Sequence, residues 1–123
     1  MNEKKEKAKL LIASEEYDAA RLALISLFEK DAGDAEICFL LGECFFKIGD
    51  ISNAVRFYQR AAEILPHKRE FFLALGSAYE AFGEEHRAIE AYLRVLELSP
   101  EYLFVTERLM ALMRSEKMNE RVI

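Results

Sequence analysis

The feature that most constrains the fold of this chain is an internal repeat of 34 residues. Shifting the sequence by that length aligns residues 35–68 with residues 69–102, and nine of the 34 positions carry identical residues. The most informative pairs are Leu41 and Leu75, Gly42 and Gly76, Phe45 and Tyr79, Gly49 and Gly83, Ala54 and Ala88, Tyr58 and Tyr92, and Pro66 and Pro100. A period of this length indicates a stack of supersecondary units, each of which buries its apolar side against its neighbours.

Each unit has the pattern of two helices joined by a short turn. Apolar or small residues recur at i, i+1, i+4, i+5 and i+8 from Ile37 to Phe45, which is one helical face. Gly49 and Asp50 then form the turn, because glycine commonly ends a helix. The second helix carries the same periodicity from Ala54 to Leu65, and Pro66 stops it.

The repeated glycines predict a close contact between the two helices of a unit. Gly42 and Gly76 lie inside first helices, where glycine costs about 1 kcal/mol relative to alanine. We expect that cost to be offset by the close approach of the neighbouring helix. Tyr58 and Tyr92 would be among the large side chains that fill the remaining space.

The pattern of large and small residues resembles the tetratricopeptide repeat (TPR). The two copies read Cys38, Leu41, Gly42, Phe45, Ala54, Tyr58, Ala61, Pro66 and Phe72, Leu75, Gly76, Tyr79, Ala88, Tyr92, Val95, Pro100. Cys38 and Phe72 stand where the family usually has tryptophan, and Val95 replaces a usual alanine. The resemblance implies an all-α fold, a right-handed α–α superhelix of three repeats followed by a C-terminal helix.

The same register extends to both ends of the chain and predicts one TPR-like domain over residues 1–123. Residues 1–34 would be a repeat with a degenerate first helix, in which Lys7 buries its stem and keeps its charge in water. Residues 35–68 and 69–102 are the two clear repeats. Residues 103–123 would be a partial repeat or a capping helix, with a turn at 115–119 and a second helix starting at Glu120.

The C-terminal segment carries more apolar residues than one buried face needs. We expect some of them to stay uncovered, and Phe104, Val105, Met110 and Met113 are candidates for self-association. Three interpretations stay open. The chain is a piece of a longer array, the segment packs on another copy, or it covers the preceding repeat and leaves little exposed.

Composition excludes several other functions. The chain has 17 basic and 22 acidic residues and a net charge of −5, which is unfavourable for nucleic-acid binding. It has neither an apolar run long enough to span a membrane nor a signal peptide, so a cytoplasmic location is the default, with a fragment of an exported protein as the alternative. Cys38 and Cys44 lack nearby histidines, and His67 and His86 lack catalytic partners in sequence. We therefore predict no metal, no cofactor and no enzymatic activity.

The resemblance also implies a binding site, because first helices of TPR domains line a concave groove that holds partner peptides or helices. The matching positions here are Glu36, Phe39, Leu40, Glu43, Phe46, Lys47, Glu70, Leu73, Ser77 and Glu80. Apolar groups among four acids predict a protein or peptide partner with apolar anchors and basic flanks. Alternative functions are a self-associating scaffold that uses the C-terminal helix, or a secretion-type chaperone.

One TPR subtype grips the C-terminal carboxylate of its partner with a set of lysine, asparagine and arginine side chains. Lys5 fits the first position of that clamp. Lys9, Leu40, Glu70 and Ala74 stand at the others, and Glu70 would repel a carboxylate. The clamp is therefore predicted to be absent.

Overall fold

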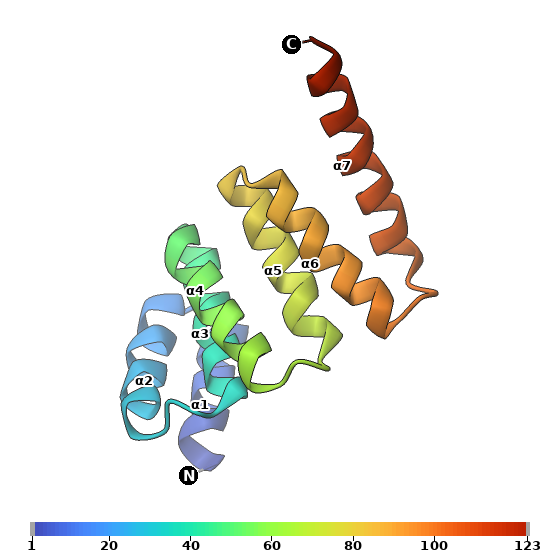
Figure 1. Cartoon of the computed structure of the whole chain (residues 1–123). Helices are drawn as coiled ribbons and strands as arrows, with labels where there is room; N and C mark the ends of the chain where they lie inside the picture. Colours follow the sequence, from blue (N-terminus) through green and yellow to red (C-terminus); the bar gives the residue numbers. More distant parts are fainter. Residues whose placement is uncertain (1, 123) are drawn as a thin grey trace. The chain divides into compact units, whose positions relative to one another are not determined.

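The computed structural model describes the backbone of residues 2–122 and the side chains of residues 3–117. This part of the chain forms seven α-helices and no strand, which confirms the all-α prediction (Figure 1). The helices are α1 (Asn2–Ala13), α2 (Tyr17–Lys30), α3 (Ala35–Ile48), α4 (Ile51–Ile64), α5 (Arg69–Phe82), α6 (Glu85–Leu98) and α7 (Leu103–Val122). None of these described helices is both long and apolar enough to cross a membrane.

The helices divide into two compact units. The first ends at Pro66 and contains α1 to α4, and the second begins at His67 and contains α5 to α7. Within each unit, every helix packs against the one that follows it in the sequence. In the second unit, Figure 1 shows the C-terminal turns of α7 projecting beyond the turn that joins α5 to α6.

The two helices of each repeat are joined by the same turn, three times at intervals of 34 residues. An amide donates to the carbonyl five residues earlier in each turn: Glu16 to Leu11 at 2.8 Å, Asp50 to Phe45 at 2.9 Å and Glu84 to Tyr79 at 2.9 Å. The residue before each donor has a left-handed backbone, with φ of 60° at Glu15, 98° at Gly49 and 85° at Gly83. This is the Schellman ending of a helix, which favours glycine. The first turn therefore puts a glutamate where the other two have glycine.

The predicted contact at the repeated glycines is confirmed. A Cβ atom on Gly42 would lie 2.4 Å from the ring of Tyr58, and one on Gly76 would lie 2.4 Å from the ring of Tyr92. Both distances are far below van der Waals contact. In the repeats at 35–68 and 69–102, the tyrosine ring of the second helix therefore packs directly on the backbone of the first.

The core follows the repeat register, and both cysteines belong to it. Cys38 and Cys44 are fully buried free thiols on α3, as predicted for packing residues. Burial raises the pKa of the Cys44 thiol to about 11, and the nearby Glu43 carboxylate adds to the effect. A thiol with so high a pKa is a poor nucleophile near neutral pH.

The predicted turn near the C-terminal end of the chain is wrong. No turn interrupts residues 115–119, because α7 continues to Val122. That stretch has no glycine or proline to end the helix, whereas α3 and α5 end at Gly49 and Gly83. At the other end, Lys7 is exposed.

Replacing Glu15 with glycine is expected to stabilise the chain. Relief of the left-handed backbone outweighs the extra entropy that glycine gives the unfolded chain, and the free energy of unfolding should rise by about 0.5–1 kcal/mol. Urea denaturation followed by circular dichroism measures the change. Ser14→Gly, one residue earlier and outside the left-handed region, is the control and should give no gain. Equal stabilisation by both variants would refute this explanation.

Replacing Gly42 with alanine is expected to destabilise the chain by about 1–3 kcal/mol, because the new methyl group overlaps the Tyr58 ring. The same denaturation measurement applies. Gly33→Ala is the matched control, since a Cβ there would meet only Asp31 Oδ1 at 3.6 Å. A Gly42→Ala variant as stable as the wild type would show that the two helices can separate without cost.

Candidate functional site

The first unit presents one mixed apolar and acidic face on α3. Glu36, Phe39, Glu43, Phe46 and Lys47 recur at i, i+3, i+7, i+10 and i+11, which places them on one side of the helix. We call this set the α3 face. Its two ends are exposed, while Phe39, Glu43 and Phe46 are partly exposed. The Phe39 ring lies 5.6 Å from the ring of Tyr58, measured between centroids.

Leu40 does not share the exposure of this face. Its relative exposure is only 8%, so the prediction that it stays uncovered is wrong. Successive helix residues are rotated by about 100° around the axis, and that rotation turns Leu40 away from the side that carries Phe39. The helical period alone was a weak guide to a residue at the edge of the face.

The charge of Glu36 is already balanced within the first unit. Lys9 Nζ lies 2.8 Å from Glu36 Oε2, and Lys5 Nζ lies 3.2 Å from Glu36 Oε1. The hydrogen bond from Lys9 lowers the pKa of Glu36 below its usual value, outweighing the effect of burial. Glu36 is thus paired with two lysines of α1, and it presents less net negative charge to a partner than the sequence indicates.

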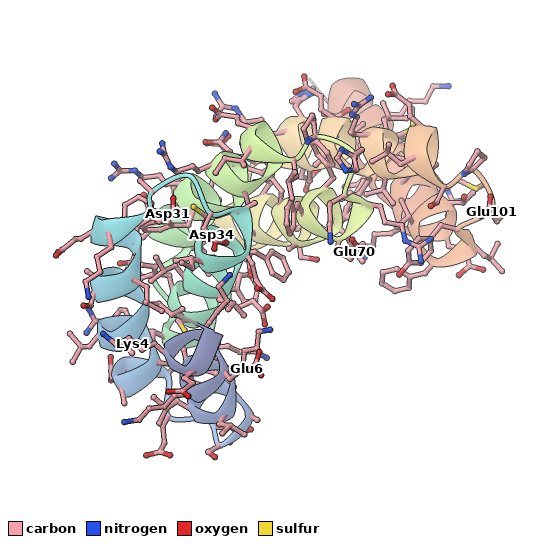
Figure 2. All side chains as sticks on the ribbon, turned by 90° about the horizontal axis from the view of Figure 1, so that it is seen from below. Lys4, Glu6, Asp31, Asp34, Glu70 and Glu101 are labelled. Atoms are coloured by element: carbon pink, nitrogen blue, oxygen red, sulfur yellow. The ribbon has the colours of Figure 1, made fainter. Side chains whose placement is uncertain are left out.

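Asp34 ties α1 to the beginning of α3 (Figure 2). Its Oδ1 accepts hydrogen bonds from the amides of Glu36 and Ile37 at 3.0 and 3.2 Å, and its Oδ2 lies 2.7 Å from Lys5 Nζ. Burial raises the pKa of Asp34, but the bonds from Lys5 and the amides outweigh it and hold the pKa below its usual value. Sequence reasoning missed this link, although aspartate before a predicted helix is a typical N-cap.

Glu43 differs from the other acid of the α3 face. Its carboxyl group is partly buried, and this burial raises its pKa above the usual value, while the nearby Lys47 acts in the opposite direction. No direct ion pair joins Glu43 to another described residue. An ionised Glu43 is therefore the group on this face that gains most from an added cation.

The predicted site residues of the second unit lie along α5. Glu70 and Ser77 are exposed and Leu73 is partly exposed. Glu70 Oε1 lies 3.6 Å from Arg69 Nε, and the Ser77 hydroxyl lies 3.5 Å from that of Tyr92.

Glu80 is the most strongly bonded acid of α5. Arg108 on α7 grips it with two nitrogens, with Nε donating to Oε2 at 3.0 Å and Nη2 donating to Oε1. The Tyr92 hydroxyl also donates to Oε2. Burial opposes ionisation, but these hydrogen bonds outweigh it and lower the pKa of Glu80. The carboxylate therefore anchors α7 to α5 within the second unit.

The candidates for self-association on α7 separate into two groups. Phe104, Met110 and Met113 are exposed, with relative exposures of 60%, 56% and 50%. Val105 is fully buried, so its assignment to an exposed surface is wrong. It lies on the buried side of α7 with Leu109 and Leu112, at the same repeat position as the buried Phe71.

Potential metal ligands and histidines were candidate chemical groups in the sequence. No group of three His, Cys, Asp or Glu side chains among them could hold a metal ion. His67 and His86 are exposed, and His86 Nδ1 lies 2.6 Å from Glu116 Oε1 on α7. The pair between His86 and Glu116 is a contact between α6 and α7.

Removal of Arg108 is expected to give a pH-dependent loss of stability. The pKa of Glu80 is lower in the folded chain than in the unfolded chain. The ionised carboxylate therefore stabilises the fold at pH values above its unfolded pKa, and this stabilisation is lost as the pH falls through its folded pKa. Arg108→Met should lower the free energy of unfolding by about 1 kcal/mol at neutral pH. The difference from the wild type should shrink in acid.

Urea denaturation at a series of pH values tests this loss. Arg87→Met is the control, because Arg87 makes an exposed pair with Glu84 and lies 6.0 Å from the centre of the Tyr79 ring, and neither contact involves Glu80. Removing it should cost no more than about 1 kcal/mol. A pH-independent effect of Arg108→Met would contradict the assigned role of its bond to Glu80.

Known proteins resemble this chain in sequence and in structure. Family models described as tetratricopeptide repeat match residues 5–69 and 70–102. The general transcriptional corepressor ssn6 of Schizosaccharomyces pombe is 26% identical over 102 residues, which cover 81% of this chain and 9% of ssn6. The chain therefore spans less than a tenth of that relative.

Two solved structures share the fold over nearly their whole length. The first TPR of Spaghetti (RPAP3), bound to the HSP90 peptide SRMEEVD, has a TM-score of 0.86 and 20% identity, covering 93% of this chain and 90% of that one. The type III secretion chaperone SycD of Yersinia enterocolitica, in complex with a peptide of the translocator YopD, has a TM-score of 0.82 and 20% identity, covering 97% and 93%. With its family match over both units, the chain belongs to the tetratricopeptide repeat family.

Proposed function

We propose that this chain is a non-enzymatic protein-interaction module that binds a segment of a partner protein. Both structural relatives described above were solved with a bound peptide, which supports this class of function. The α3 face carries the proposal, because it combines partly exposed aromatic rings with a carboxyl group that has no direct ion pair to any described residue. We propose separately that the exposed positions of α5, in the second unit, contact a partner.

Apolar anchoring is the main source of affinity in this proposal. Phe39 and Phe46 flank Glu43 on α3, four residues before it and three residues after it. Each ring still has surface to bury, and an aromatic anchor at the centre of an interface contributes about 2 kcal/mol or more. A few such contacts are enough for micromolar binding.

The ion pairs within the chain limit which acids could attract a cation of the partner. Glu36 is bonded to lysines of α1, and Glu80 is bonded to Arg108. Of the four acids in the predicted groove, Glu43 is then the best placed to attract a cation from a partner. We therefore propose a partner segment with apolar anchors and a lysine or arginine that reaches Glu43.

An acidic C-terminal peptide fits this surface poorly. Lys5 and Lys9, the cations nearest the α3 face on α1, are already bonded to Asp34 and Glu36. A partner carboxylate would have to compete with those pairs. The predicted absence of a carboxylate clamp is consistent with this arrangement. A secretion-type chaperone stays an alternative, and an aggregation-prone client encoded beside this chain would favour it.

The double variant Phe46→Ala, Glu43→Lys tests the proposal. It removes one anchor and reverses the charge at the centre of the α3 face, so binding should fall below detection while the helical fold is kept. Affinity capture from the native cells followed by mass spectrometry compares the partners of the variant with those of the wild type. Circular dichroism and the midpoint of urea denaturation report whether the variant is folded.

The control for this test is Arg56→Ala, an exposed position on α4 outside the α3 face. It should retain every partner of the wild type. Unchanged capture by a folded Phe46→Ala, Glu43→Lys variant would refute the assignment of the binding surface to α3.

A further inference from the structure

We propose that α7 pairs in antiparallel fashion with α7 of a second copy of this chain. The contact would use the α7 stripe, which we define as Leu103, Thr106, Met110, Met113 and Lys117. These residues recur at i, i+3, i+7, i+10 and i+14, the spacing of a helix seam that faces another helix. The proposal concerns a different surface from the α3 face and does not depend on the proposed function.

Four of the five residues of the α7 stripe are exposed within the part of the chain that the structure describes, and Thr106 is partly exposed. Leu103 is 66% exposed, and Met110 and Met113 are at least half exposed. The buried side of α7, made of Val105, Leu109 and Leu112, lies on the α6 side of the helix and leaves the stripe open. A shallow hollow lined by Met110, Met113, Arg114, Glu116 and Lys117 runs along it.

The repeat register shows what kind of surface the stripe is. Thr106, Met110 and Met113 match Cys38, Gly42 and Phe45 of α3. In α3 those positions face the second helix of the same repeat, as the contact between Gly42 and the Tyr58 ring demonstrates. The stripe therefore occupies the side of a first helix that another helix normally covers.

Met110 prevents an ordinary second helix of a repeat from packing on the α7 stripe. It stands where α3 and α5 have glycine, and even a single Cβ atom at those glycines would lie 2.4 Å from the packed tyrosine ring. A helix on the stripe must therefore stay further away, at a separation that methionine side chains fill. Flexible, polarisable methionine side chains suit such packing.

Charge complementarity favours a second copy of α7 as that helix. In an antiparallel pair with its two-fold axis between Met110 and Met113, Met110 of each copy lies opposite Met113 of the other copy. The same register brings Glu107 of one helix beside Arg114 of the other, twice by symmetry. Both residues are exposed and lie next to the stripe. Opposite charges at such flanking positions set the orientation of paired helices.

Sedimentation equilibrium of the full chain, from micromolar to millimolar concentration, tests the pairing. The wild type should change from monomer to dimer as the concentration rises. Met110→Glu should remain a monomer, because it places charges against each other in the seam. Phe104→Glu is the matched control, since Phe104 is equally exposed on α7 but lies away from the stripe, and this variant should dimerise like the wild type.

Charge reversal tests the antiparallel register. Glu107→Arg and Arg114→Glu should each weaken the dimer by about tenfold, because two like-charge pairs replace two opposite-charge pairs. The double variant should recover the affinity of the wild type. A wild type that stays monomeric, a dimer that survives Met110→Glu, or a double variant no tighter than the single ones would overturn the proposal. Circular dichroism confirms that each variant keeps its helices.

Discussion

The contact between a helix backbone and a tyrosine ring sets the geometry of each clear repeat. At Gly42 and at Gly76 the ring occupies the space that any other residue would fill with its own Cβ. The two helices are thereby held at close range along one side of the first helix. Phe39, Glu43 and Phe46 lie beside that contact and stay partly exposed, and the Phe39 ring is 5.6 Å from the same Tyr58 ring. The proposed α3 face thus borders the glycine contact without including Gly42.

Periodic and local features were the ones that the sequence could predict. Helices, turns at Gly49 and Gly83 and the glycine contacts each depend on residue types at fixed spacing, and each occurs twice, so that one copy supports the other. Predictions were wrong where the apolar character of a residue was weighed without its exact place on the helix. Leu40 lies at the edge of the α3 face, where a small rotation decides burial. Val105 lies on the buried side of α7, at the repeat position of the buried Phe71, so the repeat register was the better guide to its burial. The helix α7 continues because residues 115–119 contain no helix-ending glycine or proline. The turn expected there was inferred from the turns that follow α3 and α5.

The charges show a different limit of sequence reasoning. Counting acids in the predicted groove gave a negative surface, yet two of the four carboxylates are bonded to cations from other helices. Lys5 and Lys9 of α1 pair with Glu36 of α3, and Arg108 bonds Glu80 across 28 residues. No local pattern indicates such pairs, because they arise only once the helices are packed. The candidate site is consequently less acidic and more dependent on aromatic contacts than its composition suggests.

The glutamate in the left-handed turn after α1 has a consequence for motion. A strained turn joins α1 to the rest of the first unit, and among the described side chains of α1 only Ala8 is buried, so few apolar contacts hold this helix. Helices of this kind open first in local unfolding, and their amides exchange hydrogen fastest. When α1 detaches, Lys5 and Lys9 leave with it and Glu36 is released. Fluctuations of the first helix would in this way change the charge that α3 presents to a partner.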